Sequence, residues 1–407
     1  MQKNILFISD HGDPLAPLGS EQAGGQNNYV KQLALSLEKE GNRVDVITHW
    51  CNPLDPQIEN FGYSCRVIRI GAGKKTYVPK SELYDLLPAF YKEMKETIDI
   101  NTYDLVHTHY WLSGLLGSYV KADYMIPWVH TNHSLAVAKE EATGISEPVR
   151  LFTEKMILSS VDSIVATTKN EKNLIHRFVD NPSPIKVIPI GVDQAFRPLN
   201  RARTERKNPY FAFAGRLQKT KGIYTLLNAF RLLVEKNDIE PTTKLLIAGG
   251  DSECVDSYSK LPKDRNLRAA IRGLEQRVEF VGAKSQKQLA TIFNNATAVV
   301  VPSFYESFGM VAAEAQACGC PVIASKVGGL KDVVQNKVTG LHIEKGNEHN
   351  LAQAMSTVLF NRNFTNKLGR SAAIFANQEF NWTTLAKKMN SLYEVVISEK
   401  KTIYVSN

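Results

Sequence analysis

The sequence lacks the features that mark a membrane or secreted protein. No stretch among its 407 residues approaches the roughly 20 consecutive apolar residues that a membrane helix requires. The five cysteines are scattered and odd in number, which argues against a disulfide framework and favours a reducing cytoplasm. The initial segment MQKNILFISDHG has no long apolar region followed by a small-residue cleavage site. We therefore expect a cytoplasmic protein without integral membrane association, whose first apolar run is a buried strand.

Several binding signatures are also missing. The chain contains neither the G-x-G-x-x-G dinucleotide fingerprint after its first strand nor the Gly-Lys-Ser/Thr of a P-loop. It has no zinc-finger spacing, RNP-like aromatic segment or arginine-rich arm, so a nucleic-acid partner is not expected. Cys318 and Cys320 are too close and too isolated to form half of a zinc site, and we expect a structural role for them.

Charge is distributed unevenly along the chain. The formal net charge is +8, but residues 1–197 hold 20 basic and 23 acidic residues, whereas residues 198–407 hold 29 and 18. A basic half suggests an anionic partner, although a solvated basic surface explains the count equally well.

Apolar runs alternate with helical patterns twice along the chain, which indicates an α/β class with parallel sheets. A polar, aperiodic linker near residue 198 separates the two series. We predict two doubly wound Rossmann-like domains, residues 1–197 and 198–380, and a C-terminal helix over 381–407 that packs back toward the first domain. A ligand is expected in the cleft between the domains, at the carboxyl ends of the strands.

Two loops have the composition of anion-binding sites. Gly24 and Gly25 lie between the first strand and the first helix, where glycines let a ligand approach the backbone. The alternative is an ordinary turn, but the long preceding loop favours function. In GRLQKTKGIYTLL, Arg216 ends a strand while Lys219 and Lys221 precede a helix that begins near Gly222. Cations there oppose the helix dipole unless an anion binds, so a diphosphate site competes with plain solvation.

The stretch PSFYESFGMVAAEAQACGCPV carries Glu306 and Glu314. We predict a helix that starts near Ser307, runs to about Cys318 and stops at Gly319. Eight helical residues rise about 12 Å, which disfavours the roughly 5–9.5 Å separation of a hydrolytic carboxylate pair. Glu306 is predicted to bind sugar hydroxyls and Glu314 a ribose diol, with helix surface charges as the alternative.

Four histidines lie at strand ends in the first half: His107, His109, His130 and His133. The H-x-H spacing places two of them on one face of a strand, but no third ligand is evident for zinc. We expect no metal, and contact of one histidine with the substrate.

These segments together resemble the retaining GT-B glycosyltransferases of family 4. The resemblance rests on GSEQAGGQNNYV, VHTHYWLSGLLG, WVHTNHSLAVAKE, VIPIGVDQAFRP, AGRLQKTKGI, VPSFYESFGMVAAEAQACGCPVIASKVGGL and TGLHI, and covers most of the chain. The closest groups are the D-inositol-3-phosphate glycosyltransferases and the sucrose-phosphate synthases. The resemblance implies a GT-B fold, whose two domains face each other across a cleft, and a UDP-sugar donor held mainly by the second domain.

The resemblance also implies roles for single residues. The catalytic residues would be His133, beside the transferred sugar, and Glu306, which holds it. The residues that would bind the donor are Gly24, Gly25, Arg216, Lys221, Gly282, Ser307, Phe308, Gly309, Met310 and Glu314, with Phe280–Gly282 reading the nucleobase through backbone. The residues that would bind the acceptor are Asn27, Lys80, Tyr110, Ser134 and Arg150, with Lys74 or Lys75 as alternatives to Lys80. No cofactor or catalytic metal is implied, and a homodimer is compatible with the resemblance.

The expected reaction is transfer of glucose or N-acetylglucosamine to a small cyclitol or sugar, which is either phosphorylated or uncharged. We expect the acceptor hydroxyl to attack the face of the sugar that the diphosphate leaves. No protein base is evident, so the departing phosphate is expected to take the proton of that hydroxyl. An epimerase or phosphorylase of the same fold, or a sugar-nucleotide-binding protein without turnover, are the alternatives.

Overall fold

The computed structural model describes residues 2–16, 24–199, 208–236, 239–250, 255–256 and 261–405, with side chains described to residue 400. The chain divides into two compact units, Met1–Gly191 with Trp382–Asn407 and Val192–Asn381. The sequence placed the divisions after residues 197 and 380, and residues 200–207 of the linker lie outside the described part. No helix among the described residues is long and apolar enough to cross a membrane.

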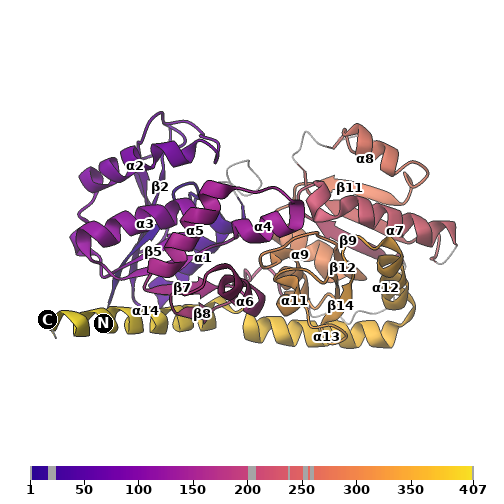
Figure 1. The fold of residues 1–407 in the computed structure, drawn as a ribbon. Coiled ribbons are helices and arrows are strands. Elements are labelled where there is room, and N and C mark those ends of the chain that lie inside the picture. The colour runs from indigo at the N-terminus through magenta and orange to yellow at the C-terminus, as the bar shows by residue number, and fades with distance from the viewer. Residues whose placement is uncertain are drawn as a thin grey trace. The chain divides into compact units, whose positions relative to one another are not determined.

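The first unit is built on an eight-stranded sheet of order β3-β4-β2-β1-β5-β6-β7-β8, with helices covering both of its faces (Figure 1). Its strands are β1 (Asn4–Ile8), β2 (Arg43–His49), β3 (Ile58–Asn60), β4 (Cys65–Ile70), β5 (Leu105–His109), β6 (Trp128–Thr131), β7 (Ser163–Ala166) and β8 (Ile185–Val187). Its helices are α1 (Gly25–Lys39), α2 (Leu83–Thr97), the short η1 (Ile100–Thr102), α3 (Trp111–Tyr124), α4 (Ala136–Thr143), α5 (Pro148–Ser160), α6 (Lys169–Phe178) and α14 (Trp382–Val405). All described pairings are parallel except that of β3 with β4.

The second unit is built on a six-stranded parallel sheet of order β11-β10-β9-β12-β13-β14. Its strands are β9 (Tyr210–Ala214), β10 (Lys244–Ala248), β11 (Val278–Gly282), β12 (Ala298–Val301), β13 (Val322–Ser325) and β14 (Gly340–Ile343). Its helices are η2 (Lys219–Lys221), α7 (Ile223–Glu235), α8 (Arg265–Ala270), α9 (Gln286–Asn295), α10 (Met310–Ala317), α11 (Leu330–Val333), α12 (Glu348–Phe360) and α13 (Arg362–Glu379). The predicted α/β class and parallel sheets are confirmed in both units.

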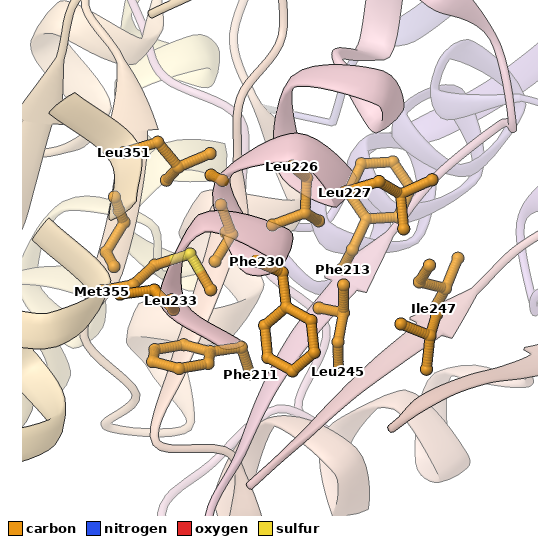
Figure 2. Packing of buried hydrophobic residues seen from close by; sticks show 14 of the residues in the cluster. Phe211, Phe213, Leu226, Leu227, Phe230, Leu233, Leu245, Ile247, Leu351 and Met355 are labelled. Carbon is orange, nitrogen blue, oxygen red and sulfur yellow. The ribbon is translucent and has the colours of Figure 1, made fainter. Parts of the chain in front are cut away.

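The core of the second unit lies between β9, β10 and the helices α7 and α12. Phe211 and Phe230 are fully buried there, as the close view shows (Figure 2). The apolar residues of α7 recur every three or four positions, so the helix presents one face to the sheet. Burial of each large side chain contributes roughly 1.5–3 kcal/mol. The aliphatic partners in this layer are Leu226, Leu227, Leu233, Leu245, Ile247, Leu351 and Met355.

The final helix, α14, belongs to the first unit although it follows the second in sequence. The buried hydroxyl of Tyr393 lies 2.6 Å from Nδ1 of His107 in β5. Lys3 donates to Asn390 and to Glu394, both at 3.0 Å, beside the start of β1. These contacts join α14 to the amino end of β1 and to the middle of β5.

Candidate functional site

In each sheet the strand order reverses at one place, between β1 and β5 in the first unit and between β9 and β12 in the second. The loops that leave the carboxyl ends of such strands diverge, and ligands of open α/β sheets bind there. The predicted site residues gather at these two places. His133 and Tyr110 belong to the first unit. Arg216, Lys221 and Glu306 belong to the second.

An ion pair dominates the site of the second unit. Nζ of Lys221 lies 2.6 Å from Oε1 of Glu306, and the hydroxyl of Ser303 donates to the same oxygen at 2.9 Å. Both charged side chains keep some solvent contact, with exposed fractions of 26% and 17%. Lys221, predicted to bind the donor, and Glu306, predicted to be catalytic, are therefore in direct contact, which the sequence did not predict.

Close packing of glycines fixes the loop that carries Glu306. A Cβ built on Gly328 would lie 2.0 Å from the carbonyl oxygen of Glu306, and one on Gly329 would lie 2.2 Å from that of Ser307. The N–H of Gly329 donates to the Glu306 carbonyl at 2.9 Å. Phe308 points into the core against Phe380, so only its backbone can face a ligand.

The predicted helix start near Ser307 is wrong. α10 begins at Met310, after Gly309, whose φ of 103° cannot continue a right-handed helix. The contacts with Gly328 and Gly329 hold the preceding residues in a loop. The estimated 12 Å rise between the two glutamates therefore does not apply, although the predicted stop is confirmed at Gly319, whose φ is 68°.

No side chain caps α10 and its first turn has no acidic residue. The N–H groups of Ala312 and Ala313 donate to the carbonyl of Gly309, at 2.9 and 3.2 Å. Those of Met310 and Val311, with the positive end of the helix dipole, are left to an external acceptor. α7 shares this property, since its N-cap is Gly222 and it also lacks a side-chain cap. The predicted start of α7 beside Lys219 and Lys221 is confirmed.

Glu314 lies in α10 between the buried Ala313 and Ala315 and is itself partly exposed. Burial among these small apolar residues, with a smaller contribution from Asp193, raises the pKa of Glu314 from 4.5 to about 8. A carboxyl group in this setting favours a neutral form or a hydrogen-bonding ligand. Such a ligand could be a diol.

The remaining predicted donor residues surround the ends of β9 and β11. Arg216 is exposed, two residues beyond β9, and its guanidinium has no hydrogen bond or ion pair among the described residues. Gly282 ends β11 with a φ of 70° and open space where a Cβ would lie. Phe280 is fully buried, so this strand can present only backbone groups to a ligand.

In the first unit, four of the five predicted acceptor residues meet around one aromatic ring. Nζ of Lys80 lies 5.4 Å from the centroid of the Tyr110 ring, and the Arg150 guanidinium lies 4.8 Å from it. Arg150 also donates to the carbonyl and the hydroxyl oxygen of Ser134, at 2.9 and 3.0 Å. Lys75, the alternative to Lys80, instead lies 3.5 Å from the centroid of the Trp50 ring.

Two carboxylates share the charge of Arg150. Nε of Arg150 donates to the buried Glu154 at 2.7 Å, and Nη1 donates to Glu147 at 3.2 Å. Burial raises the pKa of Glu154 to about 6, against the opposing effect of Arg150. The guanidinium is thus held rigidly against Tyr110.

Sequence reasoning missed two residues beside Tyr110. The ring of His11 makes an edge contact with Tyr110 at 4.8 Å between centroids, and its Nδ1 lies 3.1 Å from Oδ1 of Asp10. One oxygen of Asp10 and Nε2 of His11 are buried without a partner among the described residues. Their position directly after β1 could have revealed them, because the strand order of the sheet reverses beside β1.

The glycine pair opens α1. Gly24 is its N-cap and Gly25 its first residue, and open space surrounds the place of a Cβ on either one within the described part. The side chain of Asn27, predicted to bind the acceptor, accepts from the N–H of Gly24 at 3.0 Å and donates to the carbonyl of Asp13 at 2.9 Å. Asn27 therefore organises the loop itself. Residues 17–23 of this loop lie outside the described part.

His133 occupies a strained turn after β6. Its φ is 59°, and the N–H of Ser134 donates across it to the carbonyl of Asn132 at 2.7 Å. Nε2 of His133 lies 3.2 Å from Nδ1 of His109, and burial lowers the pKa of His133 to about 3. In the described part of the chain, no group of three or more His, Cys, Asp or Glu side chains could hold a metal ion.

Comparisons with known proteins show the family of the chain. A family model described as "Glycosyltransferase Family 4" matches residues 23–196, and one described as "Glycosyl transferases group 1" matches residues 197–375. The chain is 33% identical to the D-inositol 3-phosphate glycosyltransferase of Corynebacterium glutamicum (strain R), with 97% of each chain covered. It is 34% identical to the Nocardioides sp. protein of the same name, covering 96% of this chain and 89% of that one.

Solved structures show the same fold. The sucrose-phosphate synthase from Thermosynechococcus elongatus superposes with a TM-score of 0.86 at 35% identity, covering 98% of this chain and 100% of that one. Anabaena HepE in complex with UDP and glucose gives a TM-score of 0.73 at 19% identity, covering 97% and 100% of the two chains. At that identity the likeness concerns the fold alone.

Proposed function

Because the chain belongs to the family 4 glycosyltransferases of GT-B fold, we propose that it transfers a hexose from a UDP-sugar to a small polyol, with retention of anomeric configuration. The observation that carries the proposal is the contact of Lys221 with Glu306 beside the uncapped start of α10. This arrangement puts a cation and free N–H groups next to a carboxylate, which suits a diphosphate joined to a sugar.

Arg216 and Lys221 would bind the diphosphate, and Glu314 the ribose. Glu306 would accept a hydrogen bond from a sugar hydroxyl while Lys221 turns toward phosphate. Arg216, Lys221 and the α10 N-terminus would stabilise the charge that develops on the leaving diphosphate, so we propose that neither a metal nor a cofactor is required. Glucose and N-acetylglucosamine are the proposed sugars.

We propose a phosphorylated cyclitol or sugar as acceptor. The gathering of Lys80 and Arg150 on the ring of Tyr110 supports an anionic acceptor in the first unit. The relatives' names point the same way, since one is a D-inositol 3-phosphate glycosyltransferase and another a sucrose-phosphate synthase. An uncharged cyclitol is the competing acceptor, because Glu147 and Glu154 already share the charge of Arg150.

Retention would follow from attack on the face that the diphosphate leaves, with the phosphate accepting the proton of the attacking hydroxyl. Two features support a reaction without a protein base. Glu306 is paired with Lys221, and His133 has a pKa far below neutrality. Neither group is suited to remove a proton at neutral pH.

The test is a screen for UDP release across UDP-sugars, with phosphorylated and free cyclitols and hexoses as acceptors. Release that depends on a phosphorylated acceptor, with an α-linked product from an α-linked donor, is the expected result. UDP binding without release for any pair would indicate a binding protein, and altered sugar without an acceptor would indicate an epimerase. Release of a sugar phosphate in the presence of inorganic phosphate would indicate a phosphorylase.

A further inference from the structure

Two histidines of β5 lie under the catalytic candidate His133 in the first unit. The rings of His107 and His109 are 4.3 Å apart between centroids, and both are fully buried. Burial lowers the pKa of each well below its ordinary value, so both rings are neutral and each carries one N–H. The location of these protons determines which atom His133 can offer to a ligand.

His107 has both nitrogens engaged. Its Nδ1 lies 2.6 Å from the hydroxyl of Tyr393 and its Nε2 lies 2.8 Å from that of Thr131. A hydroxyl can donate or accept, so His107 is satisfied in either tautomer. It therefore leaves no nitrogen for His109.

The ring of His109 has one hydrogen-bond partner among the described residues. Its Nδ1 lies 3.2 Å from Nε2 of His133, while its own Nε2 is buried without a hydrogen-bond partner among the described residues. If Nε2 carried the proton, a buried N–H donor would be left unpaired. If Nδ1 carries the proton, Nε2 has only an unpaired acceptor lone pair. Unpaired buried N–H groups are the rarer of the two in proteins, which favours the proton on Nδ1.

The same assignment fixes the proton of His133. Because Nδ1–H of His109 donates to Nε2 of His133, the neutral ring of His133 carries its own proton on Nδ1. That atom has no hydrogen-bond partner in the described part of the chain, and His133 is partly exposed, which leaves Nδ1 available to a ligand. The edge contact with Tyr29, at 4.9 Å between centroids, and the turn at φ 59° hold the ring in place.

We propose that His109 is a positioning residue that holds His133 in its neutral Nδ1–H tautomer, so that His133 acts in the transfer as a hydrogen-bond donor and not as a base. The tautomer is a property of the chain itself; its use in the transfer rests on the proposed function. A donor at this place would bind a hydroxyl or phosphate oxygen of the substrate and would remain a donor throughout the neutral pH range.

The test begins with the unmodified protein. Nitrogen-15 NMR of histidine-labelled protein, with His133→Asn for assignment, separates protonated from bare ring nitrogens. Nδ1 of His133 is expected to be protonated and Nε2 bare at pH 7. A protonated Nε2 overturns the proposal, whatever the activity of the protein.

Three variants then test the role of His109. His109→Asn places an amide N–H near the position of Nδ1 and should keep the tautomer and turnover. His109→Gln places the amide near the position of Nε2 and is the matched control; it and His109→Phe should give mixed tautomers of His133 and lower kcat by roughly 10- to 100-fold. Equal kcat in His109→Gln and the unmodified protein would overturn the positioning role.

These outcomes are separate from failure of the proposed function. If no UDP-sugar is turned over with any acceptor, the proposed function fails, while the NMR measurement still decides the tautomer.

Discussion

At the scale of single residues, Glu306 has the most informative contacts, because one of its oxygens accepts from both Lys221 and Ser303. In this ion pair, Glu306 neutralises Lys221, the cation that a diphosphate would need. Donor binding must therefore exchange one anion for another at Lys221. Because Glu306 remains in the site, a bound diphosphate makes the site more negative, and Lys221 is already partly desolvated.

We predict that Glu306→Gln lowers kcat at least 100-fold but leaves the Kd for UDP within about threefold, because the substitution removes a sugar contact and frees Lys221 for phosphate. Calorimetric titration with UDP, together with steady-state kinetics, checks this. Ser303→Ala is the matched control, since it removes only the neutral donor to the same oxygen. Equal losses of binding and turnover would assign Glu306 to the nucleotide instead.

A second prediction concerns pH and Glu314. Folding raises its pKa from 4.5 to about 8, so the folded protein holds a proton that the unfolded chain releases. The contribution to stability is therefore fully present below about pH 4.5 and is lost as the pH rises through about 8. Relative to Glu314→Gln, the thermal midpoint of the unmodified protein should fall between about pH 4.5 and 8, by about 2–4 °C for each kcal/mol. Parallel curves for the two proteins would contradict the raised pKa.

At the scale of elements, tight glycine contacts position the start of α7 and the loop before α10. A Cβ built on Gly222 would lie 1.9 Å from the carbonyl oxygen of Pro302, and its φ is 73°. The close contact of Gly222 with Pro302 thus places Lys221 beside the loop of Glu306. Backbone proximity of this kind cannot be replaced by a larger side chain.

We predict that Gly222→Ala lowers the free energy of unfolding by more than 2 kcal/mol, because it adds a backbone clash to the conformational cost of about 1 kcal/mol. Gly41→Ala is the control: its φ is 86° but nothing lies within 4 Å of the added carbon, so it should show only the conformational cost. Denaturant unfolding measures both. A Gly222→Ala variant no less stable than Gly41→Ala would show that the loop yields to the added methyl group.

At the scale of the whole molecule, the chain enters the second unit after Gly191 and returns to the first at Trp382. The first unit is therefore complete only when α14 has been added to it. Tyr393 binds His107 beneath the candidate site, so the end of the chain supports the residues that the proposed reaction uses.

We predict that Tyr393→Phe destabilises the first unit by about 1–3 kcal/mol, because it leaves a buried nitrogen of His107 unpaired. Hydrogen exchange should become faster in β5 and α14 and remain unchanged in β9–β14. Ser391→Ala, at an exposed position of the same helix, is expected to leave both regions unchanged. Faster exchange spread evenly over both units would contradict the local role.

The sequence by itself determined the alternation of strands and helices and the two-unit α/β class, because apolar periodicity and the glycines at turns are local properties. It also predicted that Lys80, Tyr110, Ser134 and Arg150 act together, through their resemblance to a family. The antiparallel β3–β4 pair and the start of α10 at Met310 did not follow from it. Pairing and helix starts depend there on backbone contacts between distant segments, such as Gly328 with Glu306. Only the tertiary structure decided that Lys221 binds Glu306, that His109 contacts His133 and that Tyr393 supports His107. Each of these contacts joins residues between 24 and 286 positions apart, so it depends on the order of the strands in the sheets and on the packing of the segments that follow them.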